Sequence, residues 1–204
     1  MIDPMLKSLT LFLVLFNPFL MSIYLMDLIH DLDHRAFFRV LVRASTISGV
    51  VFVLFALGGE RIFTTLLRVR FESFLIFGGA VVFLIALQMM FSGSEAIKRM
   101  RGGDPAHLSG SVAMPFMIGP GTISASVVTG NILPFWVATG VIVLSMILTV
   151  AMLVALKQAF DAIKVRHLDL LERYIDIVGR AGALLTGTIG IQMIMEGVKG
   201  AIAS

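Results

Sequence analysis

The chain has 204 residues, of which 58% are hydrophobic, and its mean hydropathy is +0.98. Soluble globular chains contain about 45–50% apolar residues, so this composition excludes an ordinary soluble domain and indicates a membrane protein. The formal charge of +3 is too small to favour a nucleic-acid partner, and the lack of cysteine excludes disulfides and thiolate metal sites.

Six apolar segments, each about long enough to cross a bilayer, follow one another along the sequence. They cover about residues 5–28, 36–58, 73–91, 111–130, 135–156 and 177–198. The first is too long for the core of a signal peptide and is interpreted as a retained span. Residues 157–176 are charged, with apolar residues at helical spacing, which indicates an interfacial amphipathic helix or a helical extension. We therefore predict an all-α polytopic membrane protein with six transmembrane helices in a single domain, residues 1–204.

Two of these spans contain a helix-breaking motif near the centre. Asn17-Pro18 interrupts the first span and Gly119-Pro120 interrupts the fourth. Proline removes a backbone donor and clashes with the preceding turn, so each helix should break near the bilayer midplane. Such a break is tolerated only where the freed backbone groups face protein or a polar cavity. The alternative is that the prolines merely kink packed helices.

The two halves of the chain, repeat one at about 1–104 and repeat two at about 105–204, resemble each other. The proline and final serine of residues 17–22 recur in residues 119–124, and Gln88 recurs as Gln192 at nearly the same spacing. Each half has three spans, an odd number, so the second half enters the membrane in the opposite sense. This predicts two inverted three-helix repeats, as in many secondary transporters, which bind substrate at the repeat interface. Chance similarity among apolar helices is the alternative.

The basic residues predict the orientation. Loops one–two, three–four and five–six carry 11 of the 16 Lys and Arg residues. Because positive loops stay in the cytoplasm, the protein is expected in the cytoplasmic (inner) membrane with both termini outside the cytoplasm.

The broken helices also predict a binding site. Asn and Gly are accepted N-caps, and proline is favoured at the first helical position, so each motif restarts a helix. A restarted helix presents free N–H groups to an anion, while carbonyls freed on the other side can accept from an ammonium. Together these groups suit a zwitterion. The candidate substrate-binding residues are Asn17, Pro18, Ser22, Gln88, Gly119, Pro120, Gly121, Thr122, Ser124 and Gln192.

Several of these polar and small residues also have purely structural interpretations. Gln88 and Gln192 could bond between helices, at about 1 kcal/mol each, instead of completing the site. Thr186 and Thr188 are expected to bond to their own helix backbone. Five glycines are expected to allow close helix packing: Gly78, Gly79, Gly182, Gly187 and Gly190.

The spans have no Asp, Glu, Lys or Arg near their centres, which disfavours proton relays and divalent-metal transport. The four histidines fall in predicted loops: His30, His34, His107 and His167. We therefore expect no metal, no cofactor and no enzymatic activity.

Three stretches resemble the MarC family, which is related to the SnatA transporters of small neutral amino acids and grouped with LysE-like exporters. They are the first Asn-Pro, the run Met114-Pro115-Phe116-Met117-Ile118-Gly119-Pro120-Gly121-Thr122-Ile123, and the end Gly190-Ile191-Gln192-Met193-Ile194-Met195-Glu196-Gly197. The resemblance covers nearly the whole chain. It implies transport of glycine, alanine or similar amino acids, driven by a gradient of H⁺ or Na⁺.

The leading hypothesis is therefore a secondary transporter of small neutral amino acids that works by alternating access around the two breaks. Its partners would be a zwitterionic amino acid, the bilayer and a coupling ion, with no nucleic acid. The alternatives are an exporter of another small metabolite and a non-transporting accessory protein of the membrane.

Overall fold

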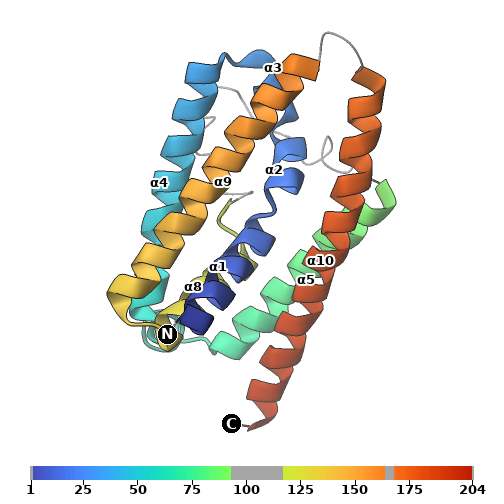
Figure 1. The fold of residues 1–204 in the computed structure, drawn as a ribbon. Coiled ribbons are helices and arrows are strands. Elements are labelled where there is room, and N and C mark those ends of the chain that lie inside the picture. Colours follow the sequence, from blue (N-terminus) through green and yellow to red (C-terminus); the bar gives the residue numbers. More distant parts are fainter. Residues whose placement is uncertain (1, 93–116, 164–167, 204) are drawn as a thin grey trace.

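The computed structural model describes residues 2–92, 117–163 and 168–203, and within them every regular element is a helix (Figure 1). The first half contains α1 (Ile2–Phe16), α2 (Pro18–Tyr24), α3 (Met26–Asp31), α4 (His34–Gly58), a π-helical turn η1 (Ile62–Leu66) and α5 (Phe71–Ser92). The second half contains α8 (Pro120–Ile132), α9 (Phe135–Ile163) and α10 (Leu168–Ala203). The predicted all-α class is confirmed over these residues.

Four helices in the described part of the chain are long and apolar enough to cross a membrane. They are His34–Gly58, Phe71–Phe91, Phe135–Ala162 and Ile177–Ala203. Large apolar side chains such as Phe77, Leu84 and Ile147 are more than half exposed on their outer faces. A soluble protein rarely exposes contiguous apolar surface of this kind, so these faces fit contact with lipid.

The first and fourth predicted spans are interrupted, and their pieces are too short to count among these four. Residues 111–116 of the predicted fourth span lie outside the described residues, as does the loop 95–104. The count of six spans therefore stays a prediction.

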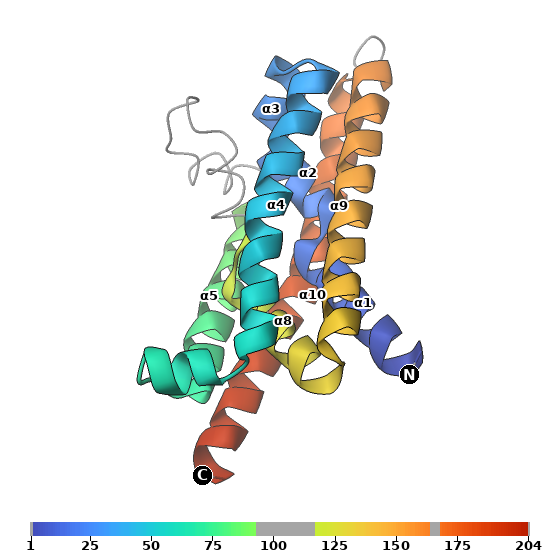
Figure 2. The same ribbon diagram turned by 90° about the vertical axis from the view of Figure 1, so that its left-hand side faces the viewer.

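The helices form two antiparallel pairs with the interrupted segments between them (Figure 1). α4 packs beside α9, and α5 packs beside α10. The chain ends lie at the same end of the molecule, and the start of α4 lies at the opposite end (Figures 1 and 2). α1 contacts α9 and α8 contacts α4, so the central segments fill the space between the pairs.

Aromatic side chains hold the first span against α4. The ring centroids of Phe12 and Phe16 lie 5.8 Å apart, and each ring lies about 6 Å from that of Phe52. All three side chains are almost completely buried. Such ring pairs contribute about 0.5–1.5 kcal/mol each beyond the area they bury.

The α5–α10 pair is close because glycines face one another. A Cβ on Gly79 would lie 2.5 Å from the Gly190 carbonyl oxygen, and one on Gly190 would lie 2.8 Å from the amide nitrogen of Phe83. A Cβ on Gly187 would lie 3.2 Å from that of Ala86. The packing role predicted for these three glycines is confirmed.

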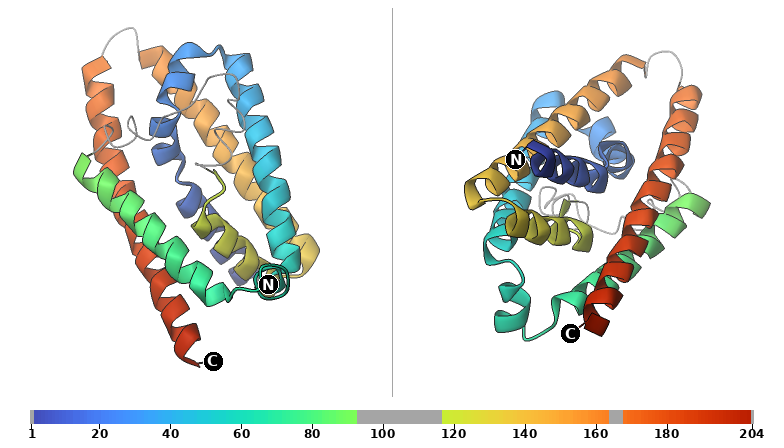
Figure 3. Two further views of the ribbon diagram at one scale, coloured as in Figure 1. Left: turned by 180° about the vertical axis from the view of Figure 1, so that it is seen from behind. Right: turned by 60° about the horizontal axis from the view of Figure 1, so that its bottom comes forward.

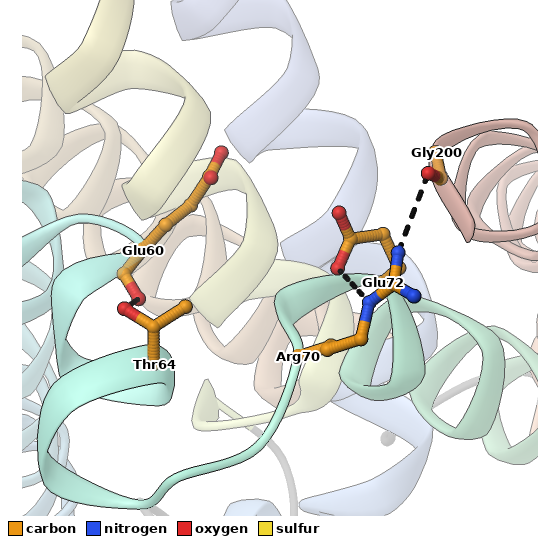
Figure 4. A network of polar contacts seen from close by, with 5 residues as sticks. All are labelled: Glu60, Thr64, Arg70, Glu72 and Gly200. Atoms are coloured by element: carbon orange, nitrogen blue, oxygen red, sulfur yellow. Dashed lines mark hydrogen bonds and ion pairs between the residues drawn. The ribbon is translucent and has the colours of Figure 1, made fainter. Parts of the chain in front are cut away.

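A polar contact closes the end of this pair where the chain terminates (Figure 4). The Arg70 side chain donates to the Glu72 carboxylate at 3.4 Å and to the carbonyl oxygen of Gly200 at 3.5 Å. A cation near the last carbonyls of a helix is favourable, so Arg70 ties the start of α5 to the end of α10.

One lysine is buried at the opposite end. The predicted fifth span ended at residue 156, but α9 continues through Ile163, which agrees with the predicted helical extension. Lys157 is 2% exposed, and its Nζ donates to the carbonyl oxygen of Ile29 in α3 at 2.6 Å. Its Nζ also lies 3.2 Å from the Asp161 carboxylate, which in turn lies 3.3 Å from His34. This contact fastens the first span to α9.

Replacing Lys157 with methionine is expected to lower the free energy of unfolding by about 1–3 kcal/mol, because a buried carbonyl and Asp161 lose their donor. The thermal unfolding midpoint of the protein in detergent measures this. Lys199→Met, at an exposed position, is the matched control and should change stability by about 0.5 kcal/mol or less. Equal midpoints for both variants would show that the contacts of Lys157 do not stabilise the protein.

Candidate functional site

The first break is a single residue between two helices. α1 ends at Phe16 and α2 begins at Pro18, which has no N–H to give the carbonyl of Val14. Asn17 has a φ of +38°, in the left-handed region where Asn is several-fold enriched among non-glycine residues. Its carbonyl accepts from the Met21 N–H at 2.9 Å, as a capping residue's carbonyl does. The predicted break of the first span is therefore confirmed.

The first span has a second, milder division between α2 and α3. The backbone bonds continue through it, since Leu25 N–H donates to the Met21 carbonyl at 2.9 Å and Ile29 N–H donates to Leu25 at 2.8 Å. The segment after Asn17 thus acts nearly as one helix, and the proline site is the true interruption.

The second break is a capped helix start. Gly119 has extended backbone angles, and Pro120 occupies the first position of α8. The Thr122 hydroxyl accepts from the Gly119 N–H at 2.9 Å and lies 2.9 Å from the Met117 carbonyl oxygen, to which it donates. This is the half of a capping box that the third helical residue supplies. The predicted restart with glycine as cap is confirmed.

The two breaks lie close together in the interior of the molecule. α1, which ends at the first break, packs beside α8, which begins at the second (Figures 1 and 3). A Cβ on Gly121 would lie 2.9 Å from Cδ2 of Leu15, so α8 approaches α1 directly at this level. Both restarted helices therefore begin in one region between the two helix pairs.

Each break also touches the long helix of the other half. A Cβ on Gly78 of α5 would overlap the ring of Pro120, and one on Gly182 of α10 would overlap the amide of Asn17. These two glycines leave the space that the breaks occupy. Their predicted packing role is confirmed, and the groups that they accommodate are those of the breaks themselves.

The three predicted hydroxyls are buried beside the breaks. Ser22 donates to the Phe19 carbonyl at 2.6 Å within α2, and Thr122 caps α8. Ser124 is also buried, one turn into α8. The structure thus brings the two breaks together where α1 meets α8, at Asn17, Pro18, Gly119, Pro120, Gly121 and Thr122. Ser22 and Ser124 lie about one turn along the helices that lead away from the breaks, α2 and α8.

The two predicted glutamines lie elsewhere. Gln88 and Gln192 are exposed on the outer faces of α5 and α10. The Gln192 side chain donates to Glu196, one turn later on the same helix, at 2.9 Å. The structure therefore does not bring the glutamines to the breaks. Thr186 and Thr188 bond to carbonyls of their own helix at 3.0 and 2.9 Å, as expected.

Ser48 of α4 was not among the predicted residues. It is completely buried, and its hydroxyl has no hydrogen-bond partner within the described residues. One turn before it, Ser45 donates to the sulfur of Met117, two residues ahead of the second break. One turn after it, Phe52 packs on Phe16, the residue that precedes the first break. Ser48 therefore lies on the core face of α4 at the depth of both breaks.

The predicted residues at the two breaks offer backbone, amide and hydroxyl groups. Two helix N-termini supply partial positive charge, and proline frees backbone carbonyls. The buried side chains of Ser22, Thr122 and Ser124 add hydroxyls within about a turn of the breaks. Within residues 2–92, 117–163 and 168–203, no group of three His, Cys, Asp or Glu could hold a metal ion. His34 lies at the start of α4, while His107 and His167 fall outside the described residues. The groups at the breaks suit a small polar molecule carrying both a positive and a negative end.

Comparison with known proteins now identifies the family. The model of MarC family integral membrane proteins matches residues 2–202. A UPF0056 membrane protein of Buchnera aphidicola from Baizongia pistaciae is 23% identical over 180 residues, 85% of each chain. Another, from Pyrococcus horikoshii, is 24% identical over 127 residues, 62% of this chain and 63% of that protein.

Two further Buchnera aphidicola relatives, from Acyrthosiphon pisum and Schizaphis graminum, are 26% and 29% identical. The matched parts span 66% and 50% of their lengths, and 59% and 48% of this chain. No solved structure matches the chain. Because the family model covers almost all of the sequence, this chain belongs to the MarC family of integral membrane proteins.

Proposed function

We propose that the protein is a secondary transporter of small neutral amino acids, with the substrate held between the two helix breaks. The observation that carries the proposal is the placement of both breaks, interior and adjacent, with restarted helices at Pro18 and Pro120. The N–H groups of the restarted helices would bind the carboxylate, and freed carbonyls and hydroxyls would accept from the ammonium. The predicted residues at the breaks carry amide, hydroxyl and backbone groups and no formal charge, which favours a substrate of no net charge.

The arrangement of the halves supports an inverted repeat. α4 and α9 run in opposite directions, as do α5 and α10, and the segments after the two breaks point to opposite ends of the molecule (Figure 1). Gly78 of the first half accommodates Pro120 of the second, and Gly182 of the second accommodates Asn17 of the first. A pseudo-twofold axis between the breaks accounts for this reciprocity. Inverted repeats of this kind allow one half to rock against the other around a central substrate.

We further propose six spans in the cytoplasmic membrane with both termini outside the cytoplasm. The chain ends lie at one end of the molecule, as an even number of crossings requires (Figure 2). Arg35, Arg39 and Arg43 lie near the other end, which the distribution of positive charge assigns to the cytoplasm. A gradient of H⁺ or Na⁺ is the proposed driving force.

Transport is tested by reconstituting the purified protein into vesicles preloaded with unlabelled alanine and adding labelled alanine outside. Counterflow above that of empty vesicles is expected, with competition by glycine but not by lysine or glutamate. Counterflow of another small metabolite alone would favour the exporter alternative. A stable protein partner without flux of any solute would favour the accessory protein.

Ser48 permits a separate prediction. Ser48→Ala removes a buried hydroxyl that has no partner within the described residues, so the unfolding midpoint should stay unchanged or rise. The apparent affinity for alanine should fall by about threefold to tenfold, because one hydrogen bond to the substrate is worth about 0.5–1.5 kcal/mol. Counterflow at several alanine concentrations measures the affinity. Ser145→Ala, which removes a hydroxyl already bonded to the Val141 carbonyl, is the control and should leave the affinity unchanged.

A further inference from the structure

A groove runs along the outside of the molecule between α4 and α9. Its volume is about 910 Å³, and its walls are almost entirely apolar. Small residues, Gly49 on α4 and Ala151 and Ala155 on α9, alternate with valines and leave it hollow. On α4 the lining extends from Phe38 to Leu54, about 24 Å at the helical rise. The groove is therefore longer than one leaflet of the hydrocarbon core, which is about 15 Å thick.

The two helices that form the groove, α4 and α9, lie side by side on the face of the molecule turned toward the viewer in Figure 2. Apolar side chains at its rim, including Val50 and Ile147, are about half exposed. Within a membrane this surface contacts lipid, and an apolar concavity loses dispersion contacts unless an apolar chain fills it.

The upper end of the groove is positively charged. Arg35 and Arg39 precede Val42 and Thr46 of the groove wall at helical spacing, so they continue the same face of α4 toward the membrane surface. Both arginines are exposed, and neither forms an ion pair within the described residues. Two neighbouring acids have partners elsewhere, because Asp33 accepts from the Ala36 N–H and Asp161 pairs with Lys157, while Asp31 is exposed at the end of α3. The Arg39 Nε donates to the Arg35 carbonyl oxygen at 3.3 Å, which holds the Arg39 side chain along this face of α4.

We propose that this groove binds one anionic phospholipid, with an acyl chain along α4 and α9 and its phosphate at Arg35 and Arg39. The guanidinium fork matches the geometry of a phosphate, and basic residues near the membrane surface attract anionic headgroups. A second copy of the chain fits the groove less well. In a twofold dimer whose axis runs along the membrane normal, each residue meets residues at its own depth in the other copy. Arg35 and Arg39 would therefore face Arg35 and Arg39 of the second copy, which carry the same charge.

The proposal is tested with delipidated protein in detergent, using phosphatidylglycerol and phosphatidylcholine with identical acyl chains as probes. Native mass spectrometry counts the bound lipids, and the unfolding midpoint reports stabilisation. One phosphatidylglycerol per chain should bind at least tenfold more tightly than phosphatidylcholine. Arg35→Gln with Arg39→Gln should remove this preference, whereas the control pair Arg61→Gln with Arg68→Gln, at the other end of the molecule, should keep it.

Filling the groove with a larger side chain tests the contact with the acyl chain separately from the contact with the headgroup. Ala155→Phe should weaken binding of both lipids by about tenfold, while Leu84→Phe on the outer face of α5 should not. Equal binding of the two lipids to the unaltered protein, or an unchanged preference in the double arginine variant, would overturn the proposal. A single cysteine at Val50, in a chain that otherwise has none, tests whether a second copy of the chain occupies the groove instead. Its efficient crosslinking into dimers in vesicles would also overturn the proposal, in favour of a second copy.

Discussion

Replacing Thr122 with valine is expected to lower alanine counterflow by at least tenfold and to destabilise the protein. Valine keeps the shape of threonine but removes the hydroxyl that accepts from the Gly119 N–H and lies 2.9 Å from the Met117 carbonyl. Both backbone groups would lose their partner in a buried region, at about 1–3 kcal/mol each. The start of α8 would then no longer be fixed in the geometry that we propose for carboxylate binding.

The control for this variant is Thr122→Ser, which keeps the hydroxyl and should retain most of the flux and stability. The two variants are compared by unfolding midpoint and by the initial rate of counterflow. If valine and serine behave alike in both measurements, the hydroxyl does not organise the second break.

Replacing Gly78 with alanine is expected to have an effect as large. The added Cβ would overlap the ring of Pro120, which cannot rotate away. Overpacking of this kind costs about 1–3 kcal/mol, and here it would displace the second break itself. The reciprocal change, Gly182→Ala, crowds the amide of Asn17 and should impair transport in the same way. Counterflow and unfolding midpoints measure both effects.

Gly140 supplies the matched control, because a Cβ there meets nothing within 4 Å. In a helix, alanine is preferred over glycine by about 1 kcal/mol, so Gly140→Ala should leave transport unchanged and raise stability slightly. Full transport by Gly78→Ala and Gly182→Ala would show that the contact of each half with the other's break is dispensable.

The positions of the breaks could be predicted from sequence because their causes are local. Proline lacks an N–H wherever it stands, and asparagine and glycine adopt the backbone angles that end or cap a helix. Asn17 and Gly119 therefore indicated the interruptions without knowledge of their neighbours. The starts of three unbroken spans are also predicted closely, since α4 and α5 begin two residues before the predicted positions and α9 begins at the predicted residue. The helix of the sixth span, α10, begins at Leu168, nine residues before the predicted start.

Other features depend on tertiary contacts that local patterns do not contain. The positions of Gln88 and Gln192 within their spans predict their depth in the membrane. Which face of each helix is covered depends on the neighbouring helices. Both glutamines face outward as a result. Ser48 resembles any other serine of an apolar span. Only its buried hydroxyl, which has no partner within the described residues, indicates a role. The charges of residues 157–176 suggested a surface segment, yet Lys157 is buried because the Ile29 carbonyl and Asp161 satisfy it.

The unfolding midpoint of the purified protein, measured with alanine, propionate and ethylamine, tests most directly whether the two breaks together hold a zwitterion. Propionate lacks the ammonium group and ethylamine lacks the carboxylate. A ligand that binds only the folded protein raises its midpoint, so alanine should raise it while neither analogue does at the same concentration. An equal shift with all three compounds, or no shift with alanine, would contradict a site built from two opposed helix breaks.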